Sequence, residues 1–166
     1  MPDLKKISRS AIPHAIQKAE RYRLLNQSWA SESICLDILE VDPTNQQVLV
    51  MLVLALSDQF GDAPKELARR ARALLDRVTD PYQRAYYAGI VCERLGHAQL
   101  ATNAMHAEAL AHESLTEAMG HFERAETLRP EGNDDSLLRW NTCARALARL
   151  RALDGEEVEY APSFGE

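Results

Sequence analysis

Residues that could carry metal or proton chemistry are concentrated between positions 97 and 121 of this 166-residue chain. The segment holds four of the five histidines together with three glutamates: His97, His106, Glu108, His112, Glu113, Glu117 and His121. Glu108 lies one helical turn before His112, and Glu117 one turn before His121, so each pair could present two ligands on one side of a helix. A small helical metal-dependent enzyme that uses the His/Glu cluster 106–121 is therefore an alternative function for this chain.

The spacing of these pairs argues against that alternative. Di-iron bundles use Glu and His three positions apart, supported by carboxylates on facing helices. Here the partners are four positions apart, and no matching pair occurs elsewhere in the chain. The chain also lacks a glycine-rich phosphate loop, a Cys-x2-Cys pair, a His-Glu-x2-His motif and a nucleophile elbow. We therefore interpret the cluster as a solvated helix face and predict no catalytic residue, no metal ligand and no cofactor.

The overall composition excludes several classes of partner. Hydrophobic residues make up 46% of the chain and charged residues 27%, which is ordinary for a folded globular protein. The net charge of -6 would repel a phosphate backbone, so nucleic acid is not expected to bind. Residues 1–10 lack the apolar run of a signal peptide, and no segment reaches the length of about 20 apolar residues that a membrane span needs. We therefore predict a cytoplasmic location and no membrane partner.

The three cysteines support the same prediction. Cys35, Cys92 and Cys143 are odd in number, widely spaced and each placed within an apolar helical pattern. Such cysteines are expected to be buried, reduced thiols rather than disulfide partners or reactive nucleophiles.

Apolar residues recur at three- and four-residue steps throughout, which predicts an all-α fold. Turn and capping residues divide the pattern into about seven helices: residues 11–25, 29–41, 46–59, 62–78, 80–96, 114–128 and 136–153. Asn45 and Asp80 are predicted N-caps, and Ser114 with Glu117 forms a predicted capping box that would start a new helix. The predicted organisation is a tail over residues 1–10, one helical domain over 11–153, and an acidic tail over 154–166.

The predicted helices form three hairpins, and each hairpin ends in a proline, at positions 43, 81 and 130. In the hairpin before Pro130, Ala118, Phe122 and Ala125 follow the pattern Ala-x3-Phe-x2-Ala, and Gly89 lies where the preceding helix must come close. This chain thereby resembles the tetratricopeptide repeat (TPR) family. The resemblance implies a right-handed superhelix of about three divergent, stacked antiparallel hairpins, closed by a capping helix. In that last helix Trp140, Cys143, Leu147 and Leu150 are predicted to point inward.

The segment 97–113 exceeds the usual repeat length. It can be interpreted as an insertion that emerges on one face and alters binding, or as an elongation of the third hairpin. In both cases Gly96 is expected at the turn between the helices of this hairpin.

The family resemblance implies a non-catalytic adaptor or scaffold that binds a peptide or helix of a partner protein on the concave face. The first helices of successive hairpins line that face in the family, which carries over to these positions: Ile16, Glu20, Arg23, Gln47, Val50, Leu54, Asp58, Gln83, Tyr86, Ile90 and Arg94. A dedicated chaperone for a secreted or assembling protein is an alternative, and homo-oligomerisation is possible.

Two further expectations concern the same face. Apolar stripes on helices are often simply buried, so Val50, Leu54 and Ile90 could instead be core residues. Tyr86 and Tyr87 are adjacent on one helix, so at most one of them is expected to face a ligand.

Overall fold

The computed structural model describes residues 2–102 and 104–158, and this part of the chain contains helices but no strand. A short 3-10 helix, η1 (Arg9–Ala11), precedes seven α-helices. Their bounds are α1 (Ile12–Leu24), α2 (Ser28–Val41), α3 (Gln46–Ser57), α4 (Pro64–Leu75), α5 (Pro81–Leu100), α6 (Ala107–Leu128) and α7 (Asp135–Val158). The all-α prediction with about seven helices is therefore confirmed.

Two predicted N-caps define the starts of helices in the middle of the chain. The Asn45 side chain accepts a hydrogen bond from the Val48 amide at 3.1 Å at the start of α3. At the start of α5, Asp80 accepts from the Gln83 amide at 2.7 Å, and Pro81 occupies the first turn. Both contacts satisfy amides that have no partner within the helix, which confirms the prediction.

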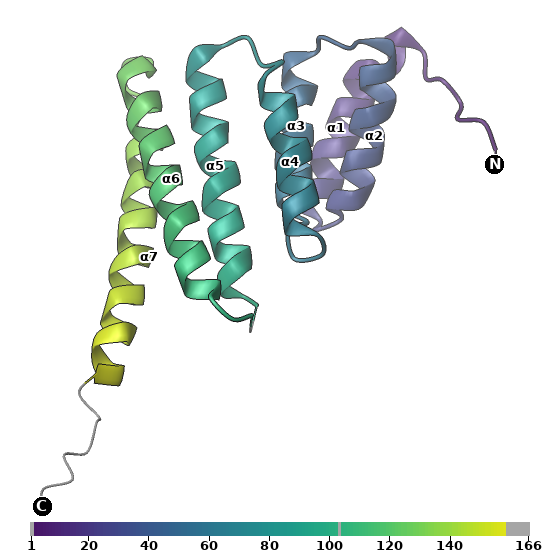
Figure 1. The fold of residues 1–166 in the computed structure, drawn as a ribbon. Coiled ribbons are helices and arrows are strands. Elements are labelled where there is room, and N and C mark those ends of the chain that lie inside the picture. Colours follow the sequence, from purple (N-terminus) through teal and green to yellow (C-terminus); the bar gives the residue numbers. More distant parts are fainter. Residues whose placement is uncertain (1, 103, 159–166) are drawn as a thin grey trace, which may run out of the picture.

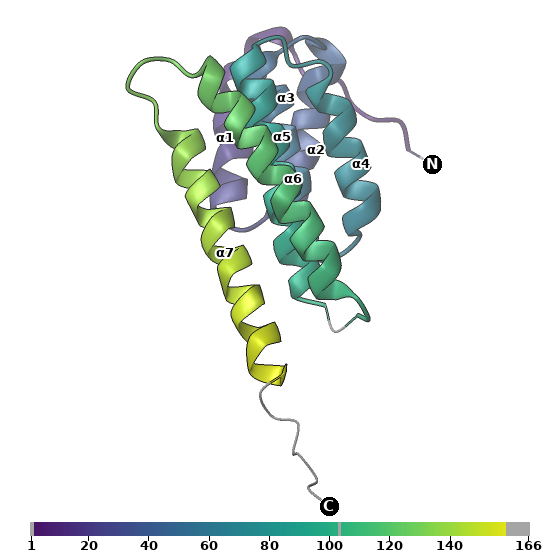
Figure 2. The same cartoon turned by 60° about the vertical axis from the view of Figure 1, so that its left-hand side comes forward.

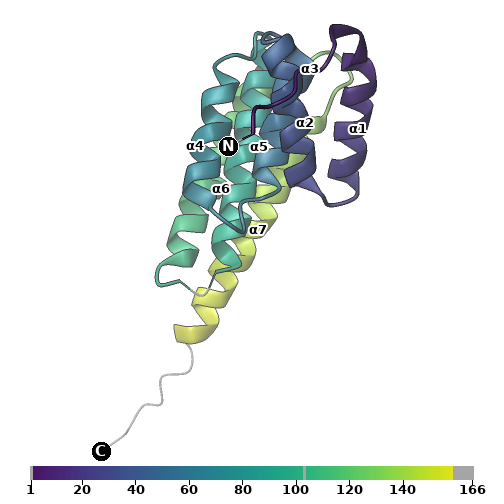
Figure 3. The ribbon, with the colours of Figure 1, turned by 90° about the vertical axis from the view of Figure 1, so that its right-hand side faces the viewer.

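The helices pack as three antiparallel hairpins in a row, α1 with α2, α3 with α4 and α5 with α6, and α7 lies against the last hairpin (Figure 1). In a view turned by 90°, which looks along this row, the hairpins overlie one another (Figure 3). The backbones of α1 and α3 come close, as do those of α3 and α5 and those of α5 and α7. Among the described residues, no similar approach joins α2 to α4 or α4 to α6. The odd-numbered helices therefore form one continuous surface, and the even-numbered helices stand further apart.

Helix α3 supplies the centre of the core. Eight of its twelve residues are buried: Val48, Leu49, Met51, Leu52, Val53, Ala55, Leu56 and Ser57. Six of them, all except Ala55 and Ser57, join apolar residues of α1, α2 and α4 in one cluster, while a second cluster joins α5, α6 and α7. Tyr87 packs against both clusters, so the core continues from one hairpin to the next. In the second cluster Trp140, Cys143, Leu147 and Leu150 point inward from α7, as predicted.

Helices α5 and α6 approach most closely where α5 carries glycine. A Cβ atom added to Gly89 would lie 2.5 Å from Cε1 of Phe122, whose side chain is 1% exposed. A Cβ atom at Gly96 would lie 2.9 Å from Cγ of Leu115. The predicted close approach at Gly89 is confirmed. The predicted turn at Gly96 is wrong, because this glycine serves packing within α5 and the helix continues to Leu100.

The segment 97–113 elongates the third hairpin. Helix α5 reaches Leu100 and α6 begins at Ala107, so that α5, α6 and α7 project beyond the shorter helices of the first two hairpins (Figures 1 and 2). The capping-box prediction at Ser114 is wrong, because Ser114 lies buried in the middle of α6. Its hydroxyl donates to Oε1 of Gln99 at 2.9 Å and so ties α6 to α5.

The ends of the predicted domain also differ from expectation. Before α1, Ile7 packs against the first core cluster and the Arg9 side chain donates to the Val41 carbonyl at 3.0 Å, so part of the predicted tail is attached to the core. Helix α7 passes Gly155 and ends at Val158, since one glycine lowers helix stability by only about 1 kcal/mol. Residues 159–166 of the predicted acidic tail lie outside the described residues. Throughout the described part, none of the helices has both the length and the apolar character required to cross a bilayer.

Replacing Gly89 with alanine is expected to destabilise the protein by about 1–2 kcal/mol in urea unfolding followed by circular dichroism. Overpacking costs about 1–3 kcal/mol, and the better helix propensity of alanine offsets part of it. Gly120→Ala is the matched control, because an added Cβ at this α6 position meets nothing within 4 Å. That control should gain up to about 1 kcal/mol. Equal effects of the two substitutions would contradict the close α5–α6 contact.

Candidate functional site

The residues predicted to bind a partner lie on α1, α3 and α5, three of the helices that form the continuous surface, except for Asp58, an exposed residue that directly follows α3. We call this surface, formed by α1, α3, α5 and α7, the odd-helix face. Glu20 and Gln47 are exposed on it. Partly buried are Ile16, Arg23, Val50, Leu54, Gln83, Tyr86 and Arg94. Ile90 is only 2% exposed and packs in the second core cluster, so the expectation that it contacts a partner is replaced by a core role.

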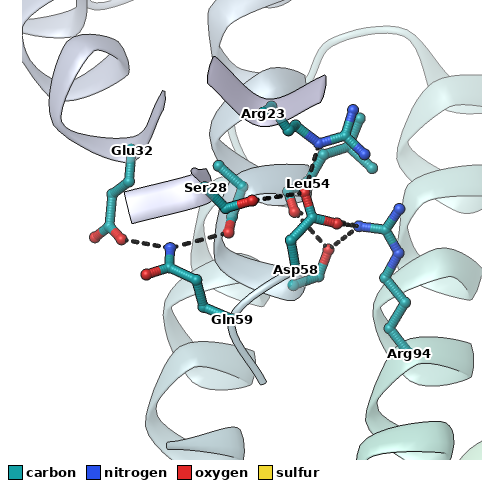
Figure 4. Close-up of polar contacts among 9 residues, drawn as sticks. Arg23, Ser28, Glu32, Leu54, Asp58, Gln59 and Arg94 are labelled. Atoms are coloured by element: carbon teal, nitrogen blue, oxygen red, sulfur yellow. Dashed lines mark hydrogen bonds and ion pairs between the residues drawn. The ribbon is translucent and has the colours of Figure 1, made fainter. Parts of the chain in front are cut away.

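Three of the predicted residues meet in one charged network. Nε of Arg23 lies 2.7 Å from Oδ2 of Asp58, and Nη1 of Arg94 lies 2.6 Å from Oδ1 of the same carboxylate (Figure 4). The Ser28 hydroxyl donates to Oδ2 as well, at 3.2 Å. Asp58 directly follows α3. It therefore connects the end of α3 with the C-terminal end of α1, the start of α2 and the middle of α5.

Arg94 makes further contacts that fix α5 against α3. Its Nη1 donates to the Leu54 carbonyl at 3.2 Å and to the Ser57 hydroxyl at 2.7 Å. Burial lowers the pKa of Arg94, and the neighbouring Asp58 opposes that shift. The side chains of Arg94 and Asp58 are 25% and 22% exposed, so their charges are largely committed to each other. The network positions the helices of the odd-helix face rather than presenting free charges to a ligand.

A second polar group lies beside this network. Nε2 of Gln59 donates to Glu32 at 2.9 Å and to the Ala55 carbonyl at 3.0 Å (Figure 4). Arg70 on α4 approaches the other Glu32 oxygen at 2.6 Å. These contacts join α2, the end of α3 and α4, so both hairpin junctions around α3 are held by polar contacts as well as by apolar packing.

Three tyrosines of α5 form an aromatic group, of which Tyr82 was not predicted. The rings of Tyr82 and Tyr86 stack with centroids 5.8 Å apart, and Tyr86 also lies 5.9 Å from Phe122. The spacing of four residues between Tyr82 and Tyr86 could have predicted this contact, because side chains at i and i+4 are neighbours on a helix. Tyr87 packs between the two core clusters, and burial raises its pKa. Neither Tyr86 nor Tyr87 is freely exposed, so these rings contribute to packing of the third hairpin.

Glu93 on α5 is a buried carboxylate that the sequence analysis did not single out. It is 3% exposed, and Nη1 of Arg139 on α7 lies 3.3 Å from its Oε1. Oε2 has no hydrogen-bond partner among the described residues. Burial raises the pKa of Glu93, although Arg139 and nearby cations act in the opposite direction. The carboxylate therefore lowers the stability of the folded state once it is ionised.

A groove of about 470 Å³ lies between α4, α5 and α6, and we call it the outer groove. Cys92 of α5 is buried at its base, and Glu117 and His121 of α6 lie beside it. One ligand atom from each of these three residues lies within 4.8 Å of the other two. Burial raises the pKa of Cys92 to about 11, despite a contact of 3.6 Å between Arg72 and its sulfur. Glu117 and His121 belong to the predicted His/Glu cluster, but their proximity to Cys92 was not predicted from the sequence.

The remaining residues of the His/Glu cluster do not join this group. His97, His106, Glu108, His112 and Glu113 are exposed, as predicted for a solvated face. His106, Glu108 and His112 line an open depression of about 730 Å³, to which Leu150 and Arg151 near the C-terminal end of α7 also contribute. All three cysteines are free and buried, as predicted.

No known protein family, curated protein or solved structure matches this chain. The resemblance to tetratricopeptide repeats thus stays a prediction from the sequence.

Replacing Asp58 with asparagine is expected to lower the free energy of unfolding by about 1–3 kcal/mol, because two partly buried guanidinium groups lose their counter-charge. Glu66→Gln is the control, since within the described part of the chain Glu66 forms an ion pair only with exposed Arg69 of the same helix. That substitution should leave the urea midpoint unchanged. A similar midpoint for both variants and the wild type would show that the Asp58 network does not hold the helices together.

Replacing Glu93 with glutamine is expected to change how stability depends on pH. The folded-state pKa of Glu93 is raised, so the wild type loses stability as pH rises from the ordinary value of 4.5 through the folded-state pKa. The variant lacks this loss, so its stability relative to the wild type should increase over that range. Urea unfolding at a series of pH values measures the difference, and a difference that stays constant or falls with pH would refute the assignment.

Proposed function

We propose that this chain is a non-catalytic interaction module of the tetratricopeptide type, which binds a peptide or helix of a partner protein along the odd-helix face. The observation that carries the proposal is the pattern of contacts between next-but-one helices. Successive hairpins bring the backbones of α1, α3, α5 and α7 close together, whereas the backbones of α2, α4 and α6 come less close and these helices meet through the ion pairs Arg70–Glu32 and Arg72–Glu117. In stacked helical arrays, such packing curves the stack around the side where the helices are closest and creates an extended binding surface.

The composition of the odd-helix face supports an extended protein ligand. Exposed Glu20 and Gln47 come from different hairpins, and partly buried Gln83 adds a polar group from the third. A ligand that lies across the face can therefore contact side chains from every hairpin at once. Because Asp58 forms ion pairs with both Arg23 and Arg94, the helices are already positioned before binding, which reduces the entropy lost on association.

We place this activity in the cytoplasm. Three free, buried cysteines support a reducing compartment, in which thiols of this kind persist without forming disulfides.

The proposal is tested with two double variants that carry the same change of charge on opposite sides of the stack. Glu20→Arg with Gln47→Arg alters the odd-helix face. Glu66→Arg with Ala73→Arg alters exposed positions of α4. Each immobilised protein is used to capture partners from a lysate of the source cells, and captured proteins are identified by mass spectrometry. We expect the first variant to lose at least about tenfold of the partner recovered by the wild type, which corresponds to about 1.4 kcal/mol, since mispaired charges within an interface can cost this much or more.

The α4 variant should recover the same partner at wild-type yield. A photoreactive amino acid placed at Gln47 should form an adduct with the partner, and one at Ala73 should not. Loss of binding in the α4 variant alone, or crosslinking from Ala73 alone, would place the binding surface elsewhere and refute the proposal.

A further inference from the structure

The outer groove brings together three side chains of the types that bind transition metals in proteins. Cys92 lies on α5, whereas Glu117 and His121 lie one turn apart on α6. Their sulfur, carboxylate oxygen and ring nitrogen all lie within 4.8 Å of one another. In a tetrahedral zinc site with bonds of about 2.0–2.3 Å, neighbouring ligand atoms are roughly 3.3–3.8 Å apart. A decrease of about 1 Å in the distances between these ligand atoms would therefore form the site. The Glu117 side chain is 48% exposed, so it can make this movement once its ion pair with Arg72 is released.

We infer that Cys92, Glu117 and His121 form a Zn²⁺ site with a fourth coordination position open to the outer groove. Thiolate, imidazole and carboxylate together match the borderline-soft character of zinc rather than that of calcium or magnesium. The close packing of α5 on α6 positions the ligands, because Gly89 and Gly96 allow these two helices to approach on either side of Cys92. This site departs from the sequence-based expectation of no metal ligand.

Two arginines stabilise the arrangement without metal. Arg72 of α4 lies 3.6 Å from the Cys92 sulfur and 3.2 Å from a Glu117 oxygen, so its guanidinium occupies the space that the ion would take. Arg124 donates to Nδ1 of His121 at 2.5 Å, which leaves the ring proton on Nε2, 3.7 Å from Glu117. Zinc binding through Nε2 therefore moves the ring proton to Nδ1, releases the thiol proton to solvent and displaces both arginines. Arg72 is 48% exposed and can turn outward. Removing its guanidinium should consequently strengthen zinc binding.

The same helix contains an internal control. Glu108 and His112 have the spacing of Glu117 and His121, but both are exposed and, among the described residues, they belong to no group of three ligands. An i, i+4 pair alone binds zinc weakly, so the buried thiol of the facing helix distinguishes the two places.

The test uses the full-length protein without a histidine tag, freed of metal and titrated with Zn²⁺ by calorimetry and with Co²⁺ by absorption spectroscopy. We expect one ion per chain and a thiolate-to-cobalt charge-transfer band. Cys92→Ser should abolish the band. Glu117→Gln, which changes a side chain that is 48% exposed, should weaken affinity by more than about 100-fold, since even indirect partners of ligands contribute 10–100-fold. His112→Ala should bind as the wild type does, and Arg72→Gln should bind more tightly.

Three results would overturn the site. These are the absence of stoichiometric binding by the wild type, a cobalt spectrum that lacks the thiolate band, and equal losses in His112→Ala and Glu117→Gln. A weaker affinity of Arg72→Gln would refute the competition between arginine and metal. Circular dichroism of each variant separates loss of ligands from loss of fold.

Discussion

The burial of α3 is the constraint on which the rest of the structure depends. This helix is apolar on almost every side, so a single hairpin cannot shield it from water. The first hairpin covers one side, α4 a second and α5 a third, which places α3 in contact with every element from α1 to α5. Asp58, directly after α3, then fixes the spacing of these neighbours through Arg23 and Arg94. The odd-helix face follows from this arrangement, because covering α3 on both sides aligns α1 and α5 beside it.

Local signals in the sequence were sufficient to predict most of the helices. The caps at Asn45 and Asp80 act through neighbouring amides, so their effect can be inferred without knowledge of the fold. The failures occurred where a distant partner changed the role of a residue. Ser114 has the local features of a cap, yet it lies inside α6, where its hydroxyl donates a hydrogen bond to Gln99 of α5 instead of to a free amide of its own helix. Gly96 has the local features of a turn, but the approach of Leu115 explains why glycine is needed there.

The same distinction applies to the sites. Repeat spacing placed the predicted binding residues on three adjacent helices, but it did not reveal that Ile90 is buried or that Asp58 joins two arginines. The contact of Cys92 with Glu117 and His121 spans 25 to 29 positions in sequence and depends on how deeply α5 packs against α6. No local sequence pattern predicts a group whose members are so far apart in the chain. The chain therefore carries two distinct surfaces, a positioned odd-helix face and an outer groove with metal-binding chemistry.

Amide hydrogen exchange of the isolated protein tests the central role of α3 most directly. Helices α3 and α4 both contain twelve residues, so they form a matched pair for this comparison. If burial of α3 holds the hairpins together, its amides should be released only by global unfolding and should exchange much more slowly than those of α4, which has one exposed side. Equal exchange rates in α3 and α4 would contradict this account, because they would show that α3 opens without disrupting the stack.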